Sequence, residues 1–173
     1  MLKSEDDAID FSLKDRTGTQ YSFKDFRNKN LVLYFYPKDD TPGCTIEANS
    51  FNQHLSAFKK LNTEVIGISG GDEQSKEKFC KKYGLKLLLL SDPDFGISRT
   101  YGVYGEKSFL GRKFMGIRRT TFILNKNRKI LKVYEAVKPE AHAQEVLEFL
   151  KAFKKQEEAE RLARRPDKEL SNR

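Results

Sequence analysis

The feature that most restricts the fold of this sequence is an alternation of apolar runs and amphipathic segments. Residues 31–36 (LVLYFY) are continuously apolar, as in a strand that is buried on both faces. Residues 44–61 then place apolar side chains at helical spacing. The order repeats with a strand-like run at 63–69, a helix at 71–84 and another strand-like run at 85–91. This order predicts an α/β fold in which helices cross over between parallel strands.

Two hairpins are predicted to extend this sheet. Residues 10–26 alternate apolar and polar side chains around the turn sequence DRTGT, which predicts an N-terminal hairpin. Residues 112–124 and 129–137 have the pattern of two strands separated by the turn sequence NKNR, so we expect an antiparallel pair. The predicted sheet is therefore central and mixed, with helices on its flanks.

The chain is predicted to close with a helix and a charged extension. Residues 138–155 begin with Pro139 near the first turn of a helix. The apolar face of that helix consists of Ala143, Val146, Leu147 and Leu150. Residues 156–173 hold few large apolar side chains, so we predict an extension that is helical and then disordered. The prediction is one domain, residues 1–155, followed by this charged C-terminal extension.

Charge and hydropathy exclude several kinds of partner. The formal net charge is +8, from 33 Lys and Arg against 25 Asp and Glu. The basic residues are interleaved with acidic ones and accompany no recognition motif, so we expect no specific nucleic-acid partner. No apolar run approaches the roughly 20 residues that span a bilayer, so we expect no membrane partner. The acidic N-terminus lacks the apolar stretch of a signal peptide, and we expect a cytoplasmic protein.

One of only two cysteines, Cys44, follows a Pro-Gly pair at the predicted start of a helix. A helix N-terminus presents unpaired N–H groups and the positive end of the helix dipole, both of which favour a thiolate. Pro42 and Gly43 suit a tight turn after the preceding strand, where open α/β sheets place their sites. Thr41 and Thr45 add hydroxyl donors nearby. Cys44 is therefore either a reactive thiolate or a small buried side chain.

Other sulfur sites are excluded or disfavoured. Glu47 occupies the position three residues after Cys44, which excludes a thioredoxin-type Cys-x-x-Cys pair. The available metal ligands, Cys44, His54, Cys80 and His142, match no ligand spacing. Both histidines lie in mostly polar helical stretches, where we expect them to face solvent. We expect neither a metal nor a cofactor.

The segment YPKDDTPGCT closely resembles the active-site segment of the peroxiredoxins, in particular the bacterioferritin comigratory protein or peroxiredoxin Q subfamily. The family pattern Pro-x-x-x-Thr-x-x-Cys is met by Pro37, Thr41 and Cys44. Further resemblance lies in KKYGL, LLSDPD, YGVYGEK, MGIRRTTFIL and HAQEVLEFL, and it covers residues 5–151. The resemblance implies a thioredoxin-like fold and thiol-dependent reduction of hydrogen peroxide and organic hydroperoxides.

The resemblance also implies roles for individual residues. Cys44 resembles the peroxidatic cysteine, Thr41 the hydroxyl that hydrogen-bonds the substrate, and Pro37 the residue that shields the pocket. The family's arginine is matched by Arg119 in RRTTF, with Arg118 as the adjacent alternative. Because successive side chains of a strand point to opposite faces, we expect only one of these arginines to reach the pocket. A guanidinium beside Cys44 stabilises the thiolate and can hold a peroxide oxygen.

The role of the second cysteine is open from the sequence. Many members of the subfamily carry a resolving cysteine five residues after the peroxidatic one, where this chain has Asn49. A second group, with this cysteine on the next helix, resembles the chain better through Cys80, 36 residues after Cys44. Neighbouring lysines favour a Cys80 thiolate if it is exposed, whereas Phe79 and Tyr83 indicate a buried, core position. A disulfide needs Cα atoms about 4.4–6.8 Å apart, so we predict local unwinding on oxidation.

Three functions remain. The first is a monomeric or weakly dimeric two-cysteine peroxiredoxin, in which Cys80 resolves Cys44 and a thioredoxin-like reductant regenerates both thiols. The second is a one-cysteine peroxiredoxin with a structural Cys80, for which Cys80→Ser would keep full turnover. The third is a noncatalytic redox sensor or chaperone, for which Cys44 would react with peroxide no faster than a free thiol.

Overall fold

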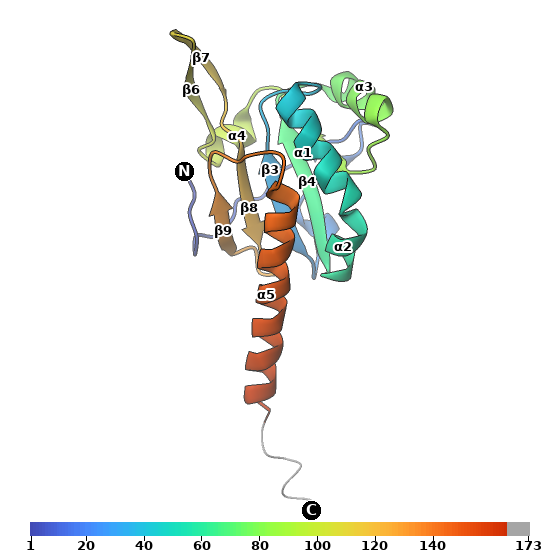
Figure 1. Ribbon diagram of the computed structural model, residues 1–173, viewed down its shortest axis with the longest axis vertical. Helices are drawn as coiled ribbons and strands as arrows, with labels where there is room; N and C mark the ends of the chain where they lie inside the picture. Colours follow the sequence, from blue (N-terminus) through green and yellow to red (C-terminus); the bar gives the residue numbers. More distant parts are fainter. Residues whose placement is uncertain (166–173) are drawn as a thin grey trace, which may run out of the picture.

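The computed structural model describes residues 1–165 and is built on a mixed seven-stranded sheet (Figure 1). The strands are β1 (Leu13–Lys14), β2 (Gln20–Tyr21), β3 (Asn30–Phe35), β4 (Thr63–Ser69), β5 (Leu88–Ser91), β8 (Thr120–Leu124) and β9 (Ile130–Tyr134). They lie in the order β2-β1-β5-β4-β3-β8-β9. The strands β3, β4 and β5 are parallel, while the β1–β2 and β8–β9 hairpins pair antiparallel with β5 and β3. The predicted mixed sheet and its N-terminal hairpin are confirmed.

Helices flank the sheet, as predicted. They are α1 (Pro42–Gln53), α2 (Leu55–Lys60), α3 (Glu73–Tyr83), α4 (Gly96–Thr100), α5 (His142–Ala163) and a short 3₁₀ helix, η1 (Phe23–Phe26). In Figure 1, α1, α2 and α5 lie across the near face of the sheet. Helix α3 lies within the predicted range of residues 71–84. Its N-cap, Asp72, accepts a hydrogen bond from the Ser75 N–H at 2.8 Å, and its C-cap, Gly84, has a positive φ of 62°.

The central strand β3 separates two hydrophobic clusters. Val32 and Tyr34 belong to the cluster that includes residues of α1, α3 and α5, whereas Leu33 and Phe35 belong to the cluster on the opposite face. Residues 31–36 are all buried, as their continuous apolar run predicts. Packing on both faces holds β3 in position. It therefore also positions the start of the loop that leads from β3 to α1.

Residues 44–61 form parts of two helices, whereas their spacing predicts one. The break is at His54, whose Nδ1 lies 2.7 Å from the carbonyl oxygen of Ser50. The backbone N–H of His54 instead donates to the carbonyl of Phe51. The imidazole thus takes the acceptor that a continuous α-helix would bond through the N–H of the same residue. This local competition ends α1 before α2 begins.

The predicted strand at residues 112–124 is divided between two sheets. Its first half, β7 (Arg112–Ile117), pairs with β6 (Tyr104–Phe109) in a hairpin that projects from the body of the molecule (Figure 1). Its second half is β8, in the main sheet. Arg118 and Arg119 lie between the two, where the chain passes from one sheet to the other. The apolar pattern indicates strands but does not indicate which sheet each strand joins.

Helix α5 begins later than predicted and continues into the predicted helical extension. Its first residue is His142, so Pro139 precedes the helix and does not occupy its first turn. The four predicted apolar residues of its face are buried. Residues 156–163 continue the helix beyond the sheet, and the disordered end predicted for the 156–173 extension lies outside the described residues. Within residues 1–165, no helix is long and apolar enough to cross a membrane.

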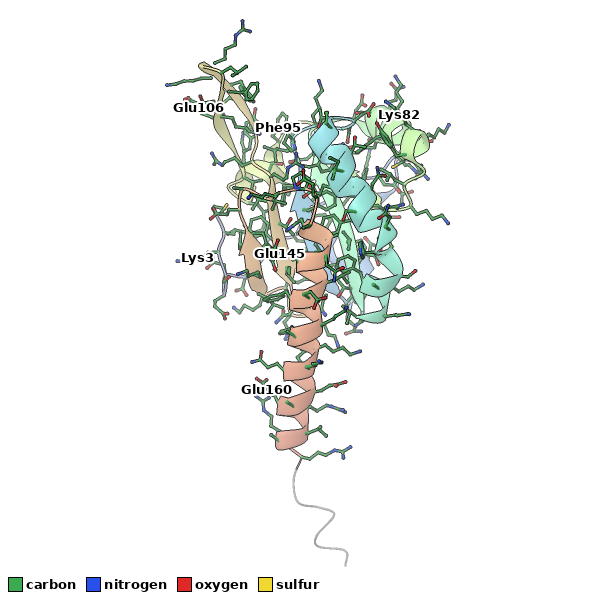
Figure 2. The ribbon with its side chains drawn as sticks, viewed as in Figure 1. Lys3, Lys82, Phe95, Glu106, Glu145 and Glu160 are labelled. Atoms are coloured by element: carbon green, nitrogen blue, oxygen red, sulfur yellow. The ribbon has the colours of Figure 1, made fainter. Side chains whose placement is uncertain are left out.

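The exposed end of α5 predicts that the folded unit ends at residue 155. Residues 154–165 are exposed, and Figure 2 shows Glu160 on the part of α5 that extends beyond the body of the molecule. We expect a chain that ends after Lys155 to keep its free energy of unfolding within about 1 kcal/mol, since exposed residues contribute little. In contrast, Leu147→Ala in the buried part of α5 should lower it by about 2–5 kcal/mol. Urea denaturation measures both, and an equal loss in both would place the boundary further along α5.

Candidate active site

Cys44 lies in the first turn of α1, directly after the loop that follows β3. Thr41 is the N-cap of α1, and Pro42 is its first residue. Proline is well suited to this place, because its missing N–H would have no partner within the helix. Cys44 is only 1% exposed. Its sulfur therefore lies within the protein, at the end of the helix where unpaired N–H groups and the helix dipole favour negative charge.

Arg119 contacts the sulfur of Cys44 directly. Its Nη2 lies 3.3 Å from the sulfur, and its Nη1 donates to Oε1 of Glu47 at 2.9 Å. Gly43 leaves room for this approach, since a Cβ at that position would meet Nη2 at 3.1 Å. A single guanidinium thus joins the sulfur to a buried carboxyl.

Glu47, which carries no predicted role, is part of this site. Its side chain is fully buried, and burial raises the pKa of its carboxyl to about 7, although Arg119 opposes this shift. Among the described residues, Oε2 of Glu47 has no hydrogen-bond partner. Its place beside Cys44 could have been predicted from its spacing in the sequence. Glu47 is three residues after Cys44, and residues three apart lie on the same face of a helix.

The neighbouring Arg118 points elsewhere. Its Nη2 lies 3.5 Å from the carbonyl oxygen of Gly102. Burial alone would lower the pKa of Arg119, but the nearby carboxyl of Glu47 and sulfur of Cys44 raise it. Arg119 therefore supplies a permanent positive charge to the site, and Arg118 is not in contact with the sulfur.

Thr41 and Pro37 lie in the loop between β3 and α1, and both are half-buried. The hydroxyl of Thr41 donates to the carbonyl oxygen of Lys38 at 3.1 Å and makes no capping bond to α1. The hydroxyl is therefore bonded within the loop and not to α1.

Cys80 lies on α3 and is not bonded to Cys44, since both thiols are free. It is 2% exposed, and burial raises the pKa of its thiol. The lysine one helical turn before Cys80, Lys76, does not face it as a free cation, because Lys76 is itself buried against Asp39. In this conformation Cys80 packs in the same hydrophobic cluster as Cys44.

Comparison with known proteins identifies the family. The AhpC/TSA family matches residues 5–133. A Helicobacter pylori (strain J99) relative is 44% identical over 143 residues, covering 83% of this chain and 94% of its own length. Peroxiredoxin Bcp of Escherichia coli K12 is 39% identical over 150 residues, covering 87% and 96%. The chain belongs to the AhpC/TSA family.

Solved structures of peroxiredoxins share the fold. The Xanthomonas campestris bacterioferritin comigratory protein, described for its alkyl peroxide reduction activity, is 36% identical with a TM-score of 0.78. The match covers 83% of this chain and 91% of that one. A cysteine-to-serine mutant of Xylella fastidiosa PrxQ is 34% identical with a TM-score of 0.84, covering 88% and 98%. The predicted thioredoxin-like fold of this peroxiredoxin is thereby confirmed.

His142 is buried in this peroxiredoxin, and the prediction that it faces solvent is wrong. Its Nε2 lies 2.7 Å from the hydroxyl of Thr121, and its ring meets those of Phe51 and Tyr134 edge to face. Burial lowers the pKa of His142, although Glu145 opposes the shift. His142 thus fastens the start of α5 to β8. Within residues 1–165, no group of three His, Cys, Asp or Glu side chains is arranged to hold a metal ion.

The raised pKa of Glu47 predicts a pH dependence of stability. Between the ordinary glutamate pKa of 4.5 and about 7, the folded protein keeps a proton that the unfolded chain has lost. The contribution of Glu47 to the free energy of unfolding is therefore present below pH 4.5 and is lost as the pH rises through 7, a change on the order of 3 kcal/mol. Glu47→Gln should remove this fall. Urea denaturation at pH 5 and pH 8 compares the two proteins, and identical pH dependence would contradict the prediction.

Proposed function

We propose that this chain is a thiol-dependent peroxidase that reduces hydrogen peroxide and organic hydroperoxides, with Cys44 as the attacking residue. The observation that carries the proposal is the 3.3 Å contact between Nη2 of Arg119 and the sulfur of Cys44 at the start of α1. A fixed positive charge at a helix N-terminus stabilises the thiolate, which is the nucleophilic form. The alkyl peroxide reduction described for the X. campestris relative supports this reaction.

In the first step, the Cys44 thiolate attacks the terminal oxygen of R–O–O–H. A sulfur–oxygen bond forms as the O–O bond breaks, so the sulfur is oxidised to a sulfenic acid and the peroxide is reduced. The departing oxygen leaves as alkoxide or hydroxide, takes up a proton and is released as alcohol or water.

The residues around the sulfur have different roles in this step. The donors of Arg119 hold the peroxide and stabilise the charge that develops on the departing oxygen. The hydroxyl of Thr41 adds a hydrogen bond to the peroxide, and Pro37 shields the pocket from water. Glu47 is a positioning residue, because its contact with Nη1 of Arg119 keeps Nη2 against the sulfur of Cys44.

In the second step, Cys80 resolves the sulfenic acid. The Cys80 thiolate attacks the sulfur of Cys44, a disulfide forms, and the oxygen leaves as water after taking up a proton. Two X. campestris peroxiredoxin Q structures support this role, because each has one cysteine replaced by serine and the two positions are 36 residues apart. Cys44 and Cys80 have the same separation. Since both lie in formed helices, we expect part of α1 or α3 to unwind before the two cysteines meet disulfide geometry.

A thioredoxin-like reductant then regenerates the enzyme. Its dithiol supplies two electrons and returns the Cys44–Cys80 disulfide to two thiols. We infer a monomer or a weak homodimer that works in the cytoplasm, where protein thiols are kept reduced. The burial of Cys80 favours one alternative, a one-cysteine cycle in which an external thiol reduces the sulfenic acid directly.

We expect Cys80→Ser to lose repeated turnover with thioredoxin but still to reduce one equivalent of hydrogen peroxide per chain. Cys44→Ser should lose both activities, because the attacking sulfur is absent. The reduced wild-type protein, given one equivalent of peroxide, should lose two hydrogens in its intact mass, and peptide mapping should locate a Cys44–Cys80 link. A stable oxygen adduct on Cys44, together with full turnover in Cys80→Ser, would establish the one-cysteine cycle.

A further inference from the structure

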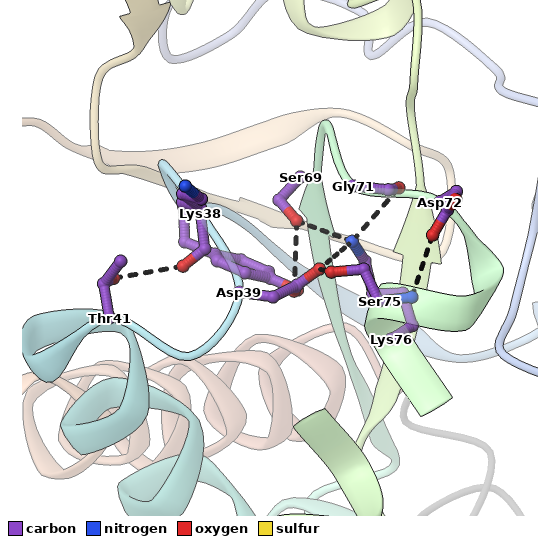
Figure 3. A network of polar contacts seen from close by, with 9 residues as sticks. Lys38, Asp39, Thr41, Ser69, Gly71, Asp72, Ser75 and Lys76 are labelled. Carbon is purple, nitrogen blue, oxygen red and sulfur yellow. Dashed lines mark hydrogen bonds and ion pairs between the residues drawn. The ribbon is translucent and has the colours of Figure 1, made fainter. Parts of the chain in front are cut away.

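A buried polar cluster joins the loop before Cys44 to the helix that carries Cys80 (Figure 3). Its centre is Lys76 on α3, whose Nζ lies 2.9 Å from Oδ2 of Asp39 and 2.7 Å from the hydroxyl of Ser69. Nζ also lies 3.4 Å from a backbone carbonyl oxygen. The side chain of Lys76 is 0% exposed, so its ammonium has exchanged water for these three oxygens.

Asp39 forms the other half of the cluster. Its Oδ1 accepts a hydrogen bond from the hydroxyl of Tyr36 at 2.6 Å, and its Oδ2 accepts one from the hydroxyl of Ser75 at 2.6 Å. The carboxylate therefore binds two consecutive residues of α3, Ser75 and Lys76, from within the loop that leads to Cys44. Figure 3 shows both contacts converging on Asp39.

The cluster lies where the two cysteine-bearing segments meet. Asp39 is five residues before Cys44, and Lys76 is one helical turn before Cys80 on the same face of α3. While Lys76 stays paired, the first turn of α3 cannot leave the loop, and Cys80 remains in the core. Cys80 also lines a pocket of about 370 Å³.

An ion pair suits a contact that must open during a reaction cycle. A buried pair contributes little net stability because its charges have lost water, yet removal of one partner leaves an uncompensated charge. When α3 unwinds, Asp39 and Lys76 both regain water, which offsets the lost contact. An apolar contact in the same place would instead expose apolar surface. The pair thus fixes the closed position without strongly opposing the open one.

We propose that the Asp39–Lys76 pair holds α3 closed over the reduced site and sets the rate at which Cys80 reaches oxidised Cys44. The proposal rests on the resolving role of Cys80. While the pair holds, a second peroxide can oxidise the Cys44 sulfenic acid to a sulfinic acid and leave as water or alcohol. When α3 opens, Cys80 attacks first and water leaves. Asp39 and Lys76 are thus positioning residues. They determine how much of the oxidised Cys44 becomes the disulfide and how much becomes the sulfinic acid.

Lys76→Met tests the proposal because it leaves the Asp39 carboxylate buried without its counter-charge. We expect the disulfide to form about tenfold faster than in the wild-type protein, with less sulfinic acid at high peroxide. Rapid mixing with hydrogen peroxide, quenching with an alkylating reagent and intact-mass measurement follow the sulfenic, disulfide and sulfinic forms. The same substitution in Cys80→Ser protein measures the first step alone, and its rate should be unchanged.

Two further variants separate the pair from a general loosening of α3. Lys82→Ala breaks an ion pair with Asp40 that joins the same loop and helix at 2.8 Å but is exposed. Because exposed pairs contribute little, this control should leave the rate of disulfide formation unchanged. Asp39→Asn combined with Lys76→Met removes both charges and should return the rate toward the wild-type value.

Disulfide formation in Lys76→Met at the wild-type rate, or equally fast in Lys82→Ala, would overturn the proposal. If Lys76→Met does not fold, Ser75→Ala replaces it, because this variant removes one hydrogen bond to Asp39. Its rate of disulfide formation is then compared with that of Lys82→Ala in the same way. A wild-type protein that forms no Cys44–Cys80 disulfide would instead overturn the resolving role of Cys80.

Discussion

The site depends on the position of the Arg119 guanidinium between the sulfur of Cys44 and the carboxyl of Glu47. Several local features of the fold together produce this position of the guanidinium. Strand β3 must end where α1 begins, so that Cys44 enters the first turn of the helix. The chain must leave the projecting β6–β7 hairpin for the main sheet at Arg119, and Gly43 must leave space for the guanidinium. The candidate site is therefore assembled from two segments that lie 75 residues apart in the sequence, rather than from one motif.

The proton on Glu47 decides how much of the positive charge of Arg119 is available to Cys44. With a pKa of about 7, this carboxyl is protonated in a large share of molecules at neutral pH. A protonated carboxyl still accepts the hydrogen bond from Nη1, so it keeps Arg119 in place while it leaves the positive charge to the thiolate. The role that we propose for the buried Asp39–Lys76 pair is different, because this pair would hold a helix that has to move before Cys80 reaches Cys44. In this proposal, one buried carboxyl serves the first chemical step and the other serves the second.

Features that depend on neighbouring residues were predictable, and features that depend on distant contacts were not. The buried strand β3, the capped helix α3 and the position of Cys44 all follow from short stretches of sequence, and the family pattern identifies Arg119. The break at His54 depends on a side chain that competes for a carbonyl, which helical periodicity does not register. His142 is buried because aromatic rings from other elements enclose it. Likewise, Lys76 looks like one of several surface lysines until the fold brings Asp39 to it from 37 residues away.

The rate constant for oxidation of Cys44 by hydrogen peroxide tests the central claim most directly. It is best measured in Cys80→Ser protein, where only the first step occurs, with Arg119→Met and Arg118→Met as a matched pair of variants. The arrangement predicts that Cys44 reacts far faster than free cysteine, and that Arg119→Met slows it by roughly a hundredfold or more. Arg118→Met should keep the rate, because Arg118 points away from the sulfur. Equal rates in the two variants, or a Cys44 no faster than a free thiol, would contradict the account.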